Sequence, residues 1–193
     1  KVKISKLNYT KDRGRKTDLK IDLDFMIDKY YNINNLTFLS DQSKIYLNNL
    51  KLNKKFETDD FKSLEIKTFK DGIQNNDFLI KKSNIITVSG KVFDAQPLLK
   101  SLYKKDDRKT FSKKFNSQIK VNLSKVITGT NDDIVEFGMI STIKKGAYDK
   151  LSLKGNYSAS EILEMSIYQV DKDKKTLHII SDRARPFVKN FDF

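Results

Sequence analysis

Hydrophobic and polar residues alternate along most of this chain. The clearest run is 19–27, where Leu, Ile and Phe at odd positions alternate with Lys, Asp and Met at even positions. Successive side chains of a strand point to opposite faces of a sheet, so this run predicts a strand with one apolar and one mostly polar face. The same period predicts strands around 36–38, 45–47, 64–66, 78–80 and 86–88, and again at 113–126, 131–144, 148–156, 160–170 and 174–181.

Residue pairs that favour tight turns separate these strands. Asp71-Gly72 is typical of a two-residue hairpin, and Asn-Asn, Lys-Asp and Lys-Gly pairs stand at other junctions. Hairpins join neighbouring strands in opposite directions. The chain is therefore predicted to be mainly β, an antiparallel meander of long twisted strands.

Two segments break the alternation and are predicted as short helices, at 94–104 and 182–191. Asp94 can accept hydrogen bonds from the free amides of a first helical turn, and Pro97 lies early enough to lose no helical hydrogen bond. Each segment carries an apolar stripe at helical spacing, and plain core packing is the simplest interpretation of both stripes. The stripes consist of Leu98, Leu99, Leu102 and Tyr103, and of Phe187, Val188 and Phe191.

The two helical segments resemble each other. Residues 95–102 align without gaps on 184–191, an offset of 89 residues, with Ala, Pro and Lys identical. The shared motif comprises Asp94, Ala95, Pro97, Leu98 and Leu99 in the first copy and Ala184, Pro186, Phe187 and Val188 in the second. We therefore predict two β-meander units, 1–104 and 113–193, each ending in a short helix and joined by a linker at 105–112.

Composition excludes several kinds of chemistry. The chain has no cysteine, which rules out disulfides, thiolate metal sites and a cysteine nucleophile. It has a single histidine, His178, which rules out a histidine-rich metal site. The adjacent acids Asp59-Asp60 and Asp132-Asp133 are poor candidates for acid–base or metal sites, because neighbours on a strand face opposite ways. We expect no enzyme activity, no cofactor and no metal site.

The net charge of +13 raises the question of a nucleic-acid partner. Only 5 of the 38 basic residues are Arg, and Lys alternates with Asp along most of the chain. This pattern favours a solvated sheet face, so no nucleic acid is expected. The densest basic segment, Lys104–Lys114, is interpreted as an exposed loop, with contact to anionic lipid headgroups as the alternative.

Two stretches resemble a known family. Residues 88–102, Val-Ser-Gly-Lys-Val-Phe-Asp-Ala-Gln-Pro-Leu-Leu-Lys-Ser-Leu, and residues 177–191, with Ser-Asp-Arg-Ala-Arg-Pro, are similar to segments of the AsmA-like bacterial envelope proteins. The resemblance implies a repeating β-groove fold, with long sheets curled into a trough. It also implies a periplasmic location, a parent protein anchored in the inner membrane, and a role in moving phospholipid between membranes and supporting the outer membrane.

About ten strands with only two short helices leave apolar sheet surface to be covered. Curling of the sheet, another chain or a ligand could cover it, and each lipid methylene buried contributes about 0.8 kcal/mol. An ordinary closed β core is the alternative for every such residue. The candidate groove residues are Leu19, Ile21, Leu23, Phe25, Ile27, Ile119, Val121, Leu123, Leu151 and Leu153.

The residues and the resemblance together favour a non-catalytic, lipid-holding segment of a longer protein. Its expected partners are phospholipid and further β-groove repeats of the same chain. The alternative is a scaffold for other envelope proteins, contacted through polar-face residues such as Lys20 and Asp22.

Overall fold

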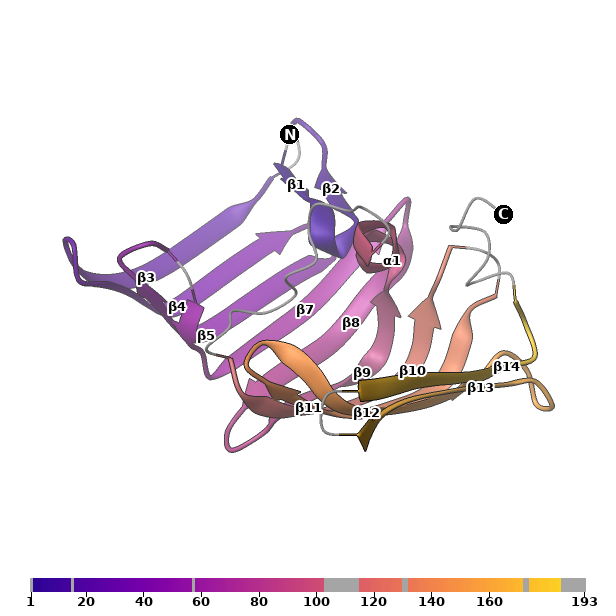
Figure 1. Cartoon of the computed structure of the whole chain (residues 1–193). Coiled ribbons are helices and arrows are strands. Elements are labelled where there is room, and N and C mark those ends of the chain that lie inside the picture. Colours follow the sequence, from indigo (N-terminus) through magenta and orange to yellow (C-terminus); the bar gives the residue numbers. More distant parts are fainter. Residues whose placement is uncertain are drawn as a thin grey trace.

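The alternating segments form one large, mostly antiparallel sheet (Figure 1). A computed structural model describes residues 2–14, 16–56, 58–102, 115–129, 132–171 and 174–184. The sheet has 12 strands in the order β14-β13-β12-β11-β10-β9-β8-β7-β5-β4-β3, with β6 pairing β5 beside this path. The strands are β3 (Asp18–Met26), β4 (Tyr30–Ser40), β5 (Ser43–Asn53), β6 (Thr58–Asp60), β7 (Ser63–Lys70), β8 (Ile73–Lys82), β9 (Ile86–Asp94), β10 (Ser117–Ile127), β11 (Ile134–Lys144), β12 (Ala147–Asn156), β13 (Ile162–Asp171) and β14 (Lys174–Ser181).

Two-residue turns close several of the hairpins, as predicted. Asp71 and Gly72 have φ angles of 52° and 79°, and Lys145 and Gly146 have 52° and 74°. Positive φ at both central residues is the mark of a type I′ turn, whose twist matches that of the flanking strands. Glycine at the second position adopts this conformation without steric strain.

The predicted antiparallel meander is wrong at one junction. Strand β10 pairs with β9 in parallel, with Val121 opposite Val88. A two-residue turn cannot connect parallel strands. The long connection between Asp94 and Ser117 instead returns the chain to the end of the sheet at which β9 begins. Two antiparallel halves, β3–β9 and β10–β14, therefore meet at this parallel pair.

One of the two predicted helices is seen. Helix α1 spans Gln96–Leu102, two residues later than the predicted start, and residues 103 and 104 lie outside the described residues. The Oδ1 atom of Asp94 accepts a hydrogen bond from the backbone N–H of Gln96 at 3.1 Å, as the capping argument requires. In the second segment, residues 182–184 are not helical, and 185–191 with Pro186, Phe187 and Val188 lie outside the described residues.

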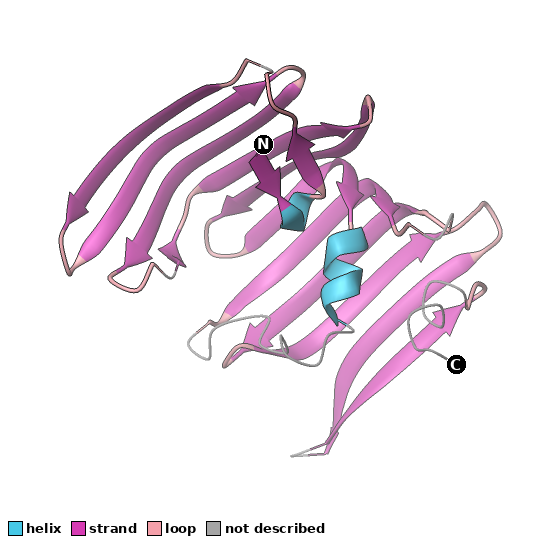
Figure 2. Cartoon of the chain, turned by 90° about the horizontal axis from the view of Figure 1, so that it is seen from above, coloured by secondary structure: helices cyan, strands magenta, loops and turns pink. Residues whose placement is uncertain are grey.

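The N-terminus forms a small element that the alternation does not predict. Strands β1 (Val2–Ile4) and β2 (Tyr9–Lys11), joined by the 3-10 turn η1 (Ser5–Leu7), pair only with each other in the described structure. We call Val2–Lys11 the N-terminal hairpin. It lies with α1 on one face of the large sheet (Figures 1 and 2).

One strand of each half, β8 and β13, is separated from the other by the 89 residues of the predicted repeat. Ile162 lies 89 residues after Ile73, and Asp171 lies 89 residues after Lys82, so β13 and β8 have the offset of the predicted repeat. The described sheet is open, with β3 and β14 at its edges and no closed or curled arrangement. The curled groove therefore stays a prediction.

Candidate functional site: the apolar face

One cross-strand row is apolar on every strand that it crosses. Its successive members are directly opposite each other in the strand register, so their side chains share one face of the sheet. The row, which we call the apolar ladder, consists of Ile21, Leu36, Leu47, Leu64, Ile80, Val88, Val121, Met139, Leu153, Met165 and Ile179. It connects the two edge strands, β3 and β14.

The ladder is covered in its middle and open at both ends. Ile21 on β3 is 51% exposed and Ile179 on β14 is 41% exposed, whereas Val121 in the centre is 8% exposed. The neighbouring rows agree, because Ile66 is buried near the middle and Leu177 at the β14 end is 56% exposed. Exposed apolar side chains at the two ends of this row indicate a surface that binds something apolar.

The predicted groove residues fall into three groups. Ile119, Val121 and Leu123 on β10 are buried, and Leu151 and Leu153 on β12 are half-buried. The remaining five belong to β3 and the turn after it, and all are exposed. These are Leu19, Ile21, Leu23, Phe25 and Ile27. The sequence identified apolar positions correctly but not which strand would be an edge.

Aromatic rings gather where β3 and β5 end and β4 begins. The rings of Phe25 and Tyr31 stack with centroids 6.2 Å apart, and Tyr31 stacks on Phe56 at 4.5 Å. Phe25 and Phe56 are nevertheless exposed. This cluster extends the open β3 end of the face with planar apolar surface.

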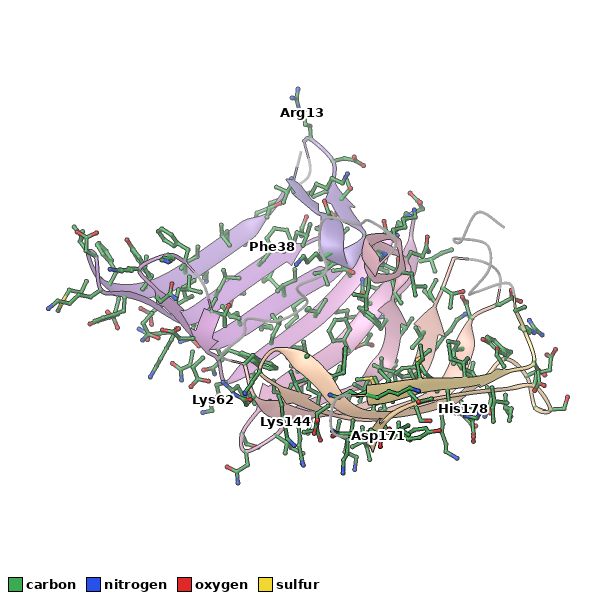
Figure 3. The ribbon with its side chains drawn as sticks, in the orientation of Figure 1. Arg13, Phe38, Lys62, Lys144, Asp171 and His178 are labelled. Carbon is green, nitrogen blue, oxygen red and sulfur yellow. The ribbon has the colours of Figure 1, made fainter. Side chains whose placement is uncertain are left out.

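The N-terminal hairpin and α1 cover the centre of the face. Tyr9 is buried and meets Phe38, which Figure 3 labels, edge-to-face with ring centroids 6.0 Å apart. Leu7 and Leu99, from the hairpin and the helix, pack against the same buried core. The two short elements thus cover apolar side chains in the rows beside the ladder.

A buried polar cluster lies among these apolar groups. Asn76 donates its side-chain amide to the backbone oxygen of Leu7 at 2.8 Å and to Thr68 Oγ1 at 2.9 Å. Asn76 is 0% exposed and Asp94 is 1% exposed. We call this group the central polar cluster, and its members are Asn8, Thr68, Asn75, Asn76 and Asp94.

The Asp94 carboxylate in this cluster accepts its hydrogen bonds from uncharged amide groups. Asp94 Oδ2 accepts from Asn8 Nδ2 at 2.8 Å and from Asn75 Nδ2 at 3.3 Å, and the Asp94 N–H donates to Asn76 Oδ1 at 3.0 Å. A buried polar group without partners is strongly destabilising, so these bonds fix the local geometry. Sequence reasoning missed the cluster, although two adjacent asparagines inside an alternating strand were a signal.

A second polar cluster ties the β14 end to the β10–β11 connection. Arg183 donates from Nη1 to Asp132 Oδ1 at 2.7 Å and from Nη2 to Glu161 Oε2. The hydrogen bond from Arg183 holds the pKa of Glu161 below its usual range. The guanidinium lies 5.5 Å from the centre of the Tyr157 ring, and burial raises the pKa of that phenol.

Three of the four adjacent acids are held in ion pairs. Asp60 Oδ1 is 2.6 Å from Lys82 Nζ, and this hydrogen bond lowers the pKa of Asp60. Asp133 pairs with Lys125 at 2.8 Å, and Asp132 belongs to the Arg183 cluster. In the described residues, Asp60, Asp132 and Asp133 therefore take part in structural contacts.

Other candidate chemistry finds no site in the described residues. His178 is exposed on β14, opposite Ser166 on the polar face (Figure 3). No group of three or more potential metal ligands comes together in the described part of the chain. Among the same residues, no helix has the length and apolarity needed to cross a bilayer. The basic segment 104–114 lies outside them.

No protein-family model, curated protein or solved structure matches this chain. The apolar face itself is therefore the strongest indication of what the chain binds.

Proposed function

We propose that the apolar face holds phospholipid acyl chains and that the chain is a non-catalytic lipid-handling segment. The observation that carries the proposal is the ladder with open ends, at Ile21 on one edge strand and Ile179 on the other. Apolar surface of this kind requires a cover in water. The half-exposed ends supply that surface, and an acyl chain supplies a matching apolar cover without charged contacts.

The free energy gained by burying methylenes, compared with the cost of association, favours a lipid with two acyl chains. Burying about ten methylenes of one chain contributes roughly 8 kcal/mol. Association of two molecules costs about 4–15 kcal/mol in lost freedom of motion. One chain roughly balances this cost, whereas two chains, at roughly 16 kcal/mol, exceed it. The headgroup can remain in water, so specificity for one headgroup is not needed.

The proposal extends to the setting of the protein. The resemblance of residues 88–102 and 177–191 to AsmA-like envelope proteins supports a periplasmic location and a parent anchored in the inner membrane. In that setting the sheet, curled into a groove by further repeats, conducts phospholipid between the membranes and so supports the outer membrane.

Photocrosslinking tests the proposal. A diazirine amino acid is placed at Ile21 or Leu153 on the apolar ladder, with Lys20, the polar-face neighbour of Ile21, as the matched control. The full chain is irradiated in membranes and its adducts are identified by mass spectrometry. Phospholipid adducts from the two ladder positions and none from Lys20 support the proposal. Equal labelling at all three, or no lipid adduct, overturns it.

A protein scaffold is the second candidate, favoured by one observation. Ile140 is 59% exposed on the polar face, in the row that also holds Ser152 and Ser166. An exposed isoleucine among polar residues is a suitable anchor for a partner protein. Protein adducts from Lys20 or Asp22 in the same crosslinking experiment support this function over lipid binding.

A further inference from the structure

The two edge strands of the sheet, β3 and β14, each have a neighbouring strand on one side only in the described residues (Figure 1). Strand β3 has nine residues and β14 has eight, and neither contains proline. All nine residues of β3 and six of the eight residues of β14 are exposed. A long edge without proline presents a row of backbone N–H and C=O groups on which another strand can pair.

The two edges run in opposite directions. From β3 to β14 the strand direction reverses at every pairing except the parallel β9–β10 pair, which gives an odd number of reversals. A second copy that continues the same sheet, with its apolar face on the same side, therefore sets its β14 antiparallel to β3 of the first copy. Each copy then uses a different edge on each side, which is a head-to-tail contact.

The backbone hydrogen-bonding groups of the two edges also match. In an antiparallel pair, opposed residues direct their N–H and C=O groups either both toward or both away from each other, so this direction alternates from strand to strand along the apolar ladder. At a parallel pair the direction does not alternate, as between Val88 and Val121. Ile21 and Ile179 therefore direct these groups either both out of the sheet or both into it. In either case the two residues can stand directly opposite each other in an antiparallel pair.

This register continues the apolar face from one copy to the next. With Ile21 opposite Ile179, Leu23 falls opposite Leu177, so two apolar rows cross the junction side by side. All four side chains are exposed in the single copy. A slip by one residue would set apolar side chains on the polar face of the neighbouring copy, which favours this register over its immediate neighbours.

The two edges carry opposite charge. Strand β3 holds three aspartates and one lysine, whereas β14 holds two lysines and no acid. Lys175 is 3.3 Å from Asp149, but Lys174 forms no ion pair within the described residues. On the polar face the register sets Asp22 opposite His178. A symmetric pairing of β3 with β3, or of β14 with β14, would instead oppose like charges, so charge favours the head-to-tail contact.

We propose that copies of this chain pair head to tail, with β3 of one copy beside β14 of the next, so that one sheet and one apolar ladder run through both. A contact between two different surfaces repeats from copy to copy, and it closes into a ring or continues as a filament. The assembly needs no lipid. That the joined ladder holds acyl chains across the junction rests on the proposed function.

Cysteine crosslinking tests the contact directly, because the parent chain has no cysteine. Asp22→Cys and His178→Cys are purified separately, one of them with an isotope label, and are then mixed without lipid and oxidised. Directly opposed cross-strand positions are close enough for a disulfide. We expect mixed disulfide dimers in about tenfold or greater excess over either homodimer.

The control for crosslinking replaces the β14 position by Lys120→Cys, an exposed position on the polar face of the central strand β10. Asp22→Cys mixed with this variant is expected to give no excess of mixed dimers. Equal amounts of mixed and homodimeric disulfides from Asp22→Cys with His178→Cys overturn the proposal.

Charge reversal tests the choice of partner edge. Asp22→Lys/Asp24→Lys makes β3 basic, and Lys174→Asp/His178→Asp makes β14 acidic. Each variant alone then opposes like charges, whereas a mixture of the two restores opposite charges at the junctions. Sedimentation velocity of the full chain without lipid measures the association. We expect the mean mass of the parent to rise with concentration, each variant to associate about tenfold or more weakly, and the equimolar mixture to recover the behaviour of the parent.

Thermal unfolding checks that each charge variant folds as the parent does. A parent that stays monomeric, or a mixture of folded variants that associates no better than each alone, overturns the assembly. The outcome is separate from that of the proposed function. A chain that assembles but carries no phospholipid contradicts only the lipid proposal, and a monomeric chain with phospholipid adducts contradicts only the assembly.

Discussion

Ile21 and Ile179 stand at opposite ends of one cross-strand row, on the two edge strands of the sheet. Ten successive register pairs connect them, every one apolar on both sides. The two side chains also share their environment, because each is about half exposed while Val121 in the middle of the row is buried. The lipid proposal depends on this relationship.

Truncation should have different effects at the centre and at the ends of the apolar face. Leu123→Ala removes a side chain that is 5% exposed and is expected to lower the free energy of unfolding by about 2–5 kcal/mol. Ile21→Ala is expected to change it by about 0.5 kcal/mol or less. Urea denaturation of both variants measures the difference, and equal losses would contradict the described cover.

Gly90 is expected to tolerate no side chain. A Cβ atom there would lie 2.2 Å from the backbone oxygen of Asp77 and 2.5 Å from Phe78 Cα, so the two strands would have to separate. We expect Gly90→Ala to destabilise the fold by about 2 kcal/mol or more, as overpacking does. Gly138→Ala is the matched control, because its Cβ would meet only Asn122 Oδ1 at 3.8 Å. Similar melting temperatures for the two variants would contradict the close approach of β8 and β9.

Replacing Asp94 should weaken the attachment of both α1 and the N-terminal hairpin. Asp94→Ala leaves the side-chain amide of Asn8 and the backbone N–H of Gln96 without their acceptor and removes one of the acceptors of Asn75. A buried unsatisfied donor costs about 1–3 kcal/mol. The exposed Asp59→Ala is the control. Hydrogen exchange should show faster exchange of the hairpin amides only in Asp94→Ala. Unchanged protection would show that the carboxylate does not hold the segment.

The Arg183 cluster should make stability fall at acid pH. Its pairing lowers the folded-state pKa of Glu161 below the unfolded value. The associated stability is therefore fully present above the usual range for a glutamate and is lost as the pH falls through the lower, folded pKa. Arg183→Met should reduce this acid-side loss, measured as the thermal midpoint from pH 7 down to pH 3. A variant whose pH profile equals the parent's would contradict the pairing.

The strands and hairpins could be predicted because their signals are local. Alternation in a run such as 19–27 specifies a two-faced strand, and Asp71-Gly72 specifies a type I′ turn whatever the rest of the fold does. The parallel β9–β10 pair depends instead on where a long connection returns. No local pattern around Val88 or Val121 carries that information.

The candidate site was predictable only in part for a related reason. The period of two shows that Leu19 and Leu123 are apolar-face residues, but burial depends on neighbours elsewhere in the chain. Leu19 is exposed because β3 is an edge, and Leu123 is buried because β10 lies in the middle of the sheet. The central polar cluster brings Asn8 within hydrogen-bonding distance of Asp94 across 86 residues of sequence, which periodicity cannot show.

Native mass spectrometry of the full chain purified from bacterial membranes tests the central claim most directly. The parent is compared with Ile21→Asp/Ile179→Asp, which places charge at both open ends of the ladder. The control is Lys20→Ser/His178→Ser, on the opposite face of the same two strands. The account predicts phospholipid adducts on the parent and the control and their loss from the aspartate variant. Adducts that persist in the aspartate variant, or a parent that carries none, would contradict it.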